Sequence, residues 1–396
     1  MKFWGVRFGS IAAAVLGALL LQGVAGHFGD FIVHLVVLAG LYVTLAVSLN
    51  LINGITGQFS IGHAAFYQVG AYSAGYLATR FHPKFHGPET IWLVIVMAAG
   101  ALGACIAGLI VGLPSLRLKG DYLAIVTLGF GEIIRIVVQN QDALGASYGF
   151  TVAPRIQIVS VVWLLAILCI AVCRNLLKSA HGLTFLAVRE DEVASSAMGV
   201  NVTRTKVTAF IIGSAFAGAA GALYAHAQAF ISPSLFTMDV SFIIVTMVVL
   251  GGTGSITGSA VAAVILFYLP EKMRDLSEIQ NSKILGFSIG LILVIVFIRQ
   301  MMEKYHGPKA TKGWIITGGV VGGVVISYIL AAILHAIPAL QGVTEGSKLR
   351  MVVFAVTLIV LMLLRPQGIF AHHEFSLSWV AKLFGKKDVP RVEVSA

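Results

Sequence analysis

The chain has 396 residues, of which 58% are hydrophobic and 11% charged, with a formal net charge of +10 and a mean hydropathy of +0.93. Soluble domains carry about one quarter charged residues, so this composition excludes an ordinary soluble domain and indicates an integral membrane protein. The positive charge does not indicate nucleic-acid binding, because the basic residues are scattered at the ends of apolar runs and form no basic and aromatic face. Anchoring on the cytoplasmic side and contact with membrane lipid headgroups account for it.

The N-terminal segment resembles a secretory signal, since Lys2 and Arg7 precede an apolar run and a short stretch of small residues. Many more apolar runs follow it along the chain. We therefore expect an uncleaved first helix.

Apolar runs long enough to cross a bilayer recur along the chain. A transmembrane helix needs roughly 20 apolar residues, and it satisfies its backbone hydrogen bonds internally. The sequence therefore predicts an all-α fold, a polytopic transmembrane helix bundle that forms a single domain over residues 1–396. The expected spans are residues 8–25, 31–52, 60–79, 91–113, 122–138, 156–172, 207–230, 240–269, 284–298, 314–337 and 349–364.

Two of these segments are interrupted by glycines and small polar residues, at positions 53–64 and 251–260. Irregular backbone at membrane depth is tolerated where it packs in protein or lines a wet cavity, so paired interruptions predict a translocation path. Glycine kinks that serve close helix packing are the alternative. The expected path residues are Gly57, Gln58, Ser60, Gly62 and His63 in the first interruption, and Thr253, Gly254, Ser255, Thr257 and Gly258 in the second.

Three side chains in or near these spans have both a functional and a structural interpretation. Glu132 and Arg135 lie three residues apart in an apolar segment, so they fall on one helix face and can pair. Intramembrane charges indicate a functional cavity or subunit contact, whereas a position near the interface would let Arg135 extend to the headgroups. His63 follows the first interruption and either lines the path or packs in the core.

Residues 174–206 form a charged loop between two apolar runs. Ionised groups in hydrocarbon cost at least a few kcal/mol each, so this segment lies in water, and its excess of Lys and Arg places it in the cytoplasm. It is a surface that a soluble protein could bind, although a run of charges is also typical of a solvated face. The residues expected to matter are Arg189, Glu190, Asp191, Glu192, Ala194 and Gly199. A short helix that ends at Gly199 would have suitable local chemistry, with the acidic run near its start.

The second interruption raises a question of topology. If residues 240–269 cross the membrane once, the basic residues from Arg299 onward fall outside the cell. If the segment dips in and returns, those residues fall in the cytoplasm, as the positive-inside rule favours. We expect the re-entrant arrangement.

Several kinds of chemistry are excluded or disfavoured. No phosphate-binding Gly-x-x-x-x-Gly-Lys-Ser/Thr motif occurs, so any ATP is hydrolysed by another polypeptide, and this chain is expected to bind no cofactor. It lacks a Ser, His and Asp set with a supporting scaffold, so we do not expect an enzyme. His82 and His86 have no Cys or carboxylate cluster beside them, and no metal site is expected. The cysteines at 105, 169 and 173 lie in apolar runs and are expected to be buried thiols.

Several motifs together resemble LivM-type permeases of branched-chain amino acid ABC importers. The loop Thr184 to Asn201 resembles the cytoplasmic coupling loop of importer permeases in its LivM form, without the Ile-x-Leu-Pro that usually follows elsewhere. Further matching segments lie at 48–66, 117–135 and 364–368. The resemblance implies that residues 174–206 are an ATPase-coupling loop.

The resemblance also implies partners and a location. The partners would be a second homologous permease, two ABC ATPase subunits that bind ATP, and a periplasmic solute-binding protein, in a bacterial inner membrane. The outer loops 82–89 and 140–155 would contact the binding protein. The alternative is a secondary transporter of amino acids driven by an ion gradient, for which broken helices are equally natural. Such a carrier usually needs embedded carboxylates, and Glu132 is the one candidate in the sequence.

The end of the chain departs from the family pattern. Residues 282–300 are echoed by residues 347–367, whereas relatives usually carry one such closing helix. Residues 301–348 are therefore expected to be an atypical inserted helical segment that keeps the number of crossings even. Residues 371–396 are then expected to be a cytoplasmic tail.

Overall fold

A computed structural model describes residues 16–23, 27, 29–82, 85–115 and 120–274, with a few isolated residues beyond position 278. Residues 16–23 are helical, which is the described part of the first expected span. The expected spans at 284–298, 314–337 and 349–364, the inserted segment 301–348 and the tail 371–396 lie outside the described residues, apart from isolated positions.

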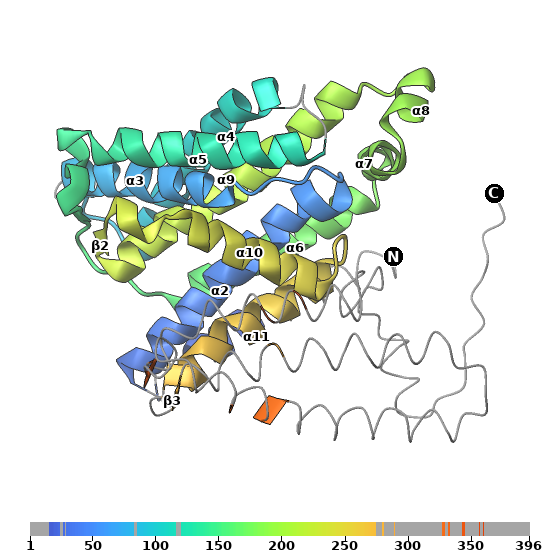
Figure 1. Ribbon diagram of the computed structural model, residues 1–396. Helices are drawn as coiled ribbons and strands as arrows, with labels where there is room; N and C mark the ends of the chain where they lie inside the picture. The colour runs from blue at the N-terminus through green and yellow to red at the C-terminus, as the bar shows by residue number, and fades with distance from the viewer. Residues whose placement is uncertain are drawn as a thin grey trace.

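The described chain is a bundle of helices, which confirms the predicted all-α class (Figure 1). Within the described ranges, six helical segments are long and apolar enough to cross a membrane by length and composition. The helices are α2 Asp30–Asn50, α3 His63–Phe81, α4 Glu89–Ser115, α5 Asp121–Gln139, α6 Val159–Leu177, α7 Ala180–Glu190, α8 Glu192–Ala197, α9 Val202–Gln228, α10 Met238–Gly251 and α11 Ile256–Arg274.

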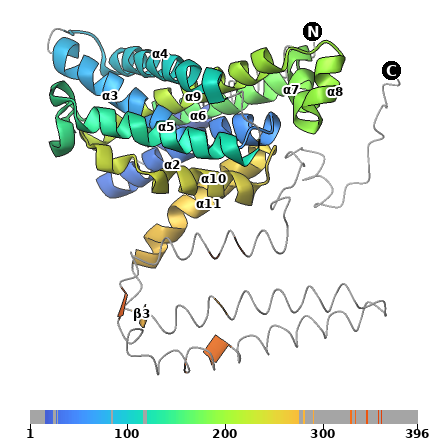
Figure 2. The same cartoon turned by 45° about the horizontal axis from the view of Figure 1, so that its top comes forward.

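Short elements join the helices. The π-helical turn η1 spans Leu51–Ile55, and the 3-10 turns η3, η4 and η5 span Asp142–Leu144, Ala146–Tyr148 and Pro233–Leu235. Strand β1, Phe150–Thr151, pairs antiparallel with β2, Phe230–Ile231, and β3, Ile279–Gln280, pairs with β4, Val343–Thr344. Figures 1 and 2 place α7 and α8 at one end of the bundle, and Figure 1 places β2 at the opposite end.

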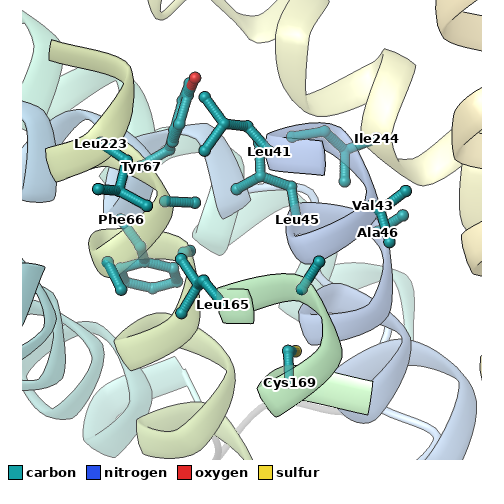
Figure 3. Packing of buried hydrophobic residues seen from close by; sticks show 14 of the residues in the cluster. Leu41, Val43, Leu45, Ala46, Phe66, Tyr67, Leu165, Cys169, Leu223 and Ile244 are labelled. Atoms are coloured by element: carbon teal, nitrogen blue, oxygen red, sulfur yellow. The ribbon is translucent and has the colours of Figure 1, made fainter. Parts of the chain in front are cut away.

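Helix α2 forms the centre of the bundle. Its sequence is apolar on every side, which is the pattern of a helix surrounded by others. Figure 3 shows Leu41 and Leu45 of α2 between side chains of α3, α6, α9 and α10. The labelled neighbours are Phe66 and Tyr67, Leu165 and Cys169, Leu223, and Ile244.

Helices α3, α4 and α9 meet at glycines. A Cβ atom on Gly70 of α3 would overlap the backbone of Gly218 in α9, and one on Gly218 would overlap the backbone of Gly100 in α4. Small residues let helix backbones approach closely, which is the main source of attraction between helices where lipid is the solvent. The three glycines therefore set the distance between these helices.

We expect Gly218→Val to destabilise the bundle, because the added side chain meets backbone that cannot move aside. Overpacking of this kind costs about 1–3 kcal/mol or more. Thermal unfolding in detergent measures the effect. Gly129→Ala is the matched control, since a Cβ atom on Gly129 meets nothing within 4 Å. Equal melting temperatures for the two variants would contradict the proposed glycine contact.

Candidate functional site

The first interruption separates α2 from α3. After Asn50 the helix widens into the π-helical turn η1, and residues 56–62 form no helix before α3 begins at His63. Thr56 donates from its hydroxyl to the carbonyl of Ile52 over 2.7 Å, and Gly57 has a φ of 70°, a conformation that favours glycine. Wide turns of this type occur mostly at functional positions.

The second interruption separates α10 from α11 at residues 252–255, where Gly252 and Gly254 have φ values of 110° and 94°. The chain reverses direction there. Asn50, at the end of α2, bonds to Ser255, whereas Tyr42, earlier in α2, stacks on Phe267, later in α11, with ring centroids 5.4 Å apart. Helix α11 is therefore antiparallel to α2, and Figure 1 shows α10 and α11 as the two arms of a hairpin.

The two interruptions touch one another through the side-chain amide of Asn50. Its Nδ2 donates to the carbonyl of Ser255 over 3.0 Å, and its Oδ1 accepts from the backbone N–H of Gly254 over 2.8 Å. Gly54 lies against the backbone of Gly254, where a Cβ atom would overlap it. One buried side chain thus gives an acceptor to the N–H of Gly254 and a further donor to the carbonyl of Ser255, which also accepts from the N–H of Ser259.

The charged loop folds into two short helices with their own caps. Ser179 accepts from the N–H of Gly182 at the start of α7. The carboxylate of Asp191 accepts from the N–H groups of Val193 and Ala194, over 2.8 and 3.1 Å, at the start of α8. Gly199, with a φ of 85°, lies just past the end of α8. These caps fix the shape of the segment in water.

The position expected for the acidic run is correct for two of its three residues. Asp191 caps α8, and Glu192 is its first residue. Glu190 instead ends α7 and pairs with Arg189, with 2.8 Å between Oε1 and Nη2. A single residue separates the two helices, so the run spans a helix end and a helix start.

The charged loop is bonded to the first interruption. Nη1 of Arg189 donates to the carbonyl of Gly54 over 3.1 Å, and the Arg189 side chain lies against Gly57, where a Cβ atom would be 2.8 Å from Cγ of Arg189. Nε2 of Gln58 donates to the carbonyl of Lys206 over 3.5 Å, and the buried ammonium of Lys206 pairs with Glu192. The charged loop therefore contacts the first interruption, and the first interruption contacts the second.

The outward side of the loop carries large apolar side chains in a segment that is otherwise charged. Val193 and Met198 of the α8 region are 71% and 85% exposed, and Leu183 of α7 is also exposed. Apolar side chains exposed beside charged ones are available for contact with another protein. Ala194 takes part in the same turn through its N–H, which Asp191 caps.

A small cleft lies beside the start of α3. It is bounded by α3, α5 and α10, and its empty volume is about 210 Å³ including the open mouth. Of the expected path residues, Gly62 lines it, and Glu132 forms part of the opposite wall. Glu132 and Arg135 form the predicted pair, with 2.7 Å between Oε2 and Nη2. The remaining lining residues are Ile61, Ala64, Ala65, Leu128, Gly131, Phe236, Thr237, Met238 and Ser241.

The other expected path residues do not line this cleft. Gln58 and Ser60 are buried, and His63 is fully buried, with Nε2 2.9 Å from the hydroxyl of Ser48 and an edge contact to Phe66. This is the packing interpretation of His63. Gly258 packs against the backbone of Gly251. Thr253, Gly254, Ser255 and Thr257 also lie away from the lining and surround the contact with Asn50.

Some important residues were not expected from the sequence. Asn50 was assigned to an apolar span, although a polar amide at the end of such a run itself indicates a specific hydrogen-bonding role. Ser241 accepts from the N–H of Ala64 over 3.1 Å and joins α10 to α3, a contact that spacing alone does not reveal. Among the residues described here, no group of three His, Cys, Asp or Glu side chains could hold a metal ion.

Membrane-length helices, two irregular segments packed against one another and a small cleft between helices are typical of a multi-pass membrane transport protein. The comparisons identify the family: residues 31–297 match the model described as branched-chain amino acid transport system / permease component. The chain belongs to this family.

Curated relatives agree with this assignment. The high-affinity branched-chain amino acid transport system permease protein LivM of Escherichia coli (strain K12) is 34% identical over 74% of this chain and 75% of its own length. The probable LivM of Methanocaldococcus jannaschii is 27% identical over 71% of this chain and 92% of its own. The E. coli permease LivH is 24% identical over 66% of this chain and 91% of its own. No solved structure matches the chain.

Asn50→Ala should destabilise the protein, because it leaves the buried N–H of Gly254 without its acceptor, although the carbonyl of Ser255 keeps its bond from the N–H of Ser259. Each unpaired buried group costs about 1–3 kcal/mol. Thermal unfolding in detergent measures the loss. Asn140→Ala is the control, since that exposed amide makes a bond only to its own helix, at Ile136. A melting temperature like that of the control would show that Asn50 does not hold the interruptions together.

Proposed function

We propose that this chain is a transmembrane subunit of an ATP-driven importer that carries branched-chain amino acids or a related small polar solute across a bacterial inner membrane. ATP hydrolysis would reside on separate ATPase subunits. The observation that supports this most directly is the bond between Arg189 of the charged loop and Gly54 of the first interruption. The names of the relatives supply the solute class.

The charged loop is suited to dock on an ATPase. Its two helices are short, capped and placed at one end of the bundle (Figure 2). Met198 and Val193 project from it as apolar anchors, and anchors of this kind carry most of the energy in a protein interface. Arg189, Glu190, Asp191 and Glu192 lie beside them and would give the contact its register.

Closure of the ATPase subunits would then move the solute gate through contacts within the bundle. A displacement of α7 reaches the first interruption through Arg189, and Asn50 passes it to the second. Lys206 passes the displacement of α8 to α9, which packs on α3 and α4. Irregular backbone is the part of a helix bundle that can change shape without breaking regular hydrogen bonds.

The wider assembly follows from the same proposal. A second permease of the same family would complete the path, and the two ATPase subunits would bind the two charged loops. A periplasmic binding protein would deliver solute at the opposite end of the bundle, near β1 and β2. Glu132 is already paired with Arg135, which makes it a poor proton carrier and disfavours a secondary transporter.

Proteoliposomes that hold this chain, its partner permease, the ATPase subunits and the binding protein should accumulate L-leucine only when ATP is present on the ATPase side. Uptake measured with labelled L-leucine, with a non-hydrolysable ATP analogue as control, tests this. Uptake driven by a sodium or proton gradient in vesicles without ATPase subunits would overturn the proposal in favour of a carrier.

Met198→Asp should weaken ATPase binding, because it places a charge where an apolar anchor would be desolvated. We expect at least about a tenfold loss of affinity, as for the central residues of other interfaces. Co-purification with the ATPase subunits and ATP-dependent uptake should fall together, while membrane insertion is unchanged. Tyr148→Asp is the control for co-purification with the ATPase subunits, since Tyr148 is comparably exposed but lies in η4, at the opposite end of the bundle from the charged loop. Unchanged co-purification of Met198→Asp would contradict docking at α8.

A further inference from the structure

One face of α3 continues the wall of the cleft into the bundle. Ala64 and Ala65 line the cleft. Residues three and four positions further along a helix lie on the same face, so Gln68 is directly beyond this pair, and Tyr72 follows one turn later. We call Ala64, Ala65, Gln68 and Tyr72 the α3 stripe.

The polar groups of the α3 stripe have no protein partner. Gln68 is fully buried, and neither its Oε1 nor its Nε2 is hydrogen-bonded to any part of the chain that the structure describes. The same holds for the hydroxyl of Tyr72. A buried amide left unpaired is costly, and such groups in a native protein call for a specific explanation.

The unpaired groups are confined to one region. Within the described ranges, every buried side-chain nitrogen or oxygen without a partner lies between positions 58 and 72, on the first interruption and α3. Other buried polar side chains in the bundle are bonded, such as Asn50 to Ser255 and Thr44 to Gly40. A general packing fault would scatter unpaired atoms over all the helices, so their clustering indicates a polar route.

Aromatic side chains close the far end of this face. Phe236 lines the cleft and stacks on Tyr72, with ring centroids 6.2 Å apart, and on Tyr67 at 5.3 Å. Tyr224 of α9 completes the group at 5.9 Å from Phe236. The cleft and the buried Gln68 thus lie on the same side of α3. The aromatic rings cover this side, and a modest movement of Phe236 would open access from the cleft to Gln68.

We propose that Gln68 binds the solute as it passes, and that the α3 stripe lines the route from the cleft. A side-chain amide presents one acceptor and two donors close together, which complements the ammonium and carboxylate groups of a zwitterionic α-amino acid. The methyl groups of Ala64 and Ala65 give this face an apolar surface for an aliphatic side chain. The assignment of the zwitterion rests on the proposed function, whereas the route is read from the burial and the unpaired atoms.

The first test replaces the amide by an apolar group of similar size. Gln68→Leu in the full importer should lower L-leucine uptake by about tenfold or more, because a site built around a hydrogen bond discriminates strongly when that bond is lost. The variant should melt no lower than the native protein, since it removes an unpaired buried group. Normal uptake by Gln68→Leu would overturn the proposal.

Two tyrosines of α3 give a matched pair for the same assay. Tyr72→Phe removes an unpaired buried hydroxyl and should also reduce uptake, whereas Tyr76→Phe removes an exposed one on the next turn and should not. Equal uptake by the two variants would argue against the route at Tyr72. Absence of ATP-dependent uptake in the native complex would instead count against the proposed function.

The second test reports access to the route even if a variant transports poorly. In a chain with Cys105, Cys169 and Cys173 replaced by Ala, Gln68→Cys should react with a small water-soluble thiol reagent during turnover, and L-leucine should slow the reaction. Ala74→Cys is the control, because Ala74 is fully buried on another side of α3. If Gln68→Cys reacted with the reagent as slowly as Ala74→Cys, Gln68 would lie in a closed core.

Discussion

The amide of Asn50 is the contact on which the interior of this protein depends. Two irregular segments, between η1 and α3 and between α10 and α11, pack against one another, and their buried backbone groups need hydrogen-bond partners within the protein. Asn50 satisfies one donor and one acceptor of the second interruption from the end of the first. Because Gly54 and Gly254 carry no side chains, the two irregular segments can approach closely enough for this to happen. The two irregular segments therefore stabilise one another.

The same logic explains where small residues occur. Hydrophobic burial does little to bring helices together in lipid, so close backbone contact and hydrogen bonds must hold the bundle. Gly70, Gly100 and Gly218 hold α3, α4 and α9 at a fixed distance. Gly251 and Gly258 do the same where α10 and α11 separate.

The sequence predicted the described helices well, because long apolar runs leave little choice of structure. Residues 31–52 were expected to be helical, and α2 spans Asp30–Asn50. The pairing of Glu132 with Arg135 could also be predicted, since helix periodicity fixes their relative position. The contact between Asn50 and Ser255 was not, because it joins residues far apart in the chain and depends on how the hairpin turns. Gln68 was missed for a related reason, since its lack of partners is a property of the packed bundle.

Helix caps give the charged loop a defined structure instead of that of a flexible connection. Asp191 and Ser179 fix the helix starts, and the bond from Glu192 to the buried Lys206 ties α8 to α9. In the proposed mechanism, a displacement of α8 would therefore be passed to α9 or to the first interruption. Both lead to α3, which follows the interruption in the chain and packs on α9. Because the start of α3 forms one wall of the cleft, the proposed displacement would change the shape of the cleft.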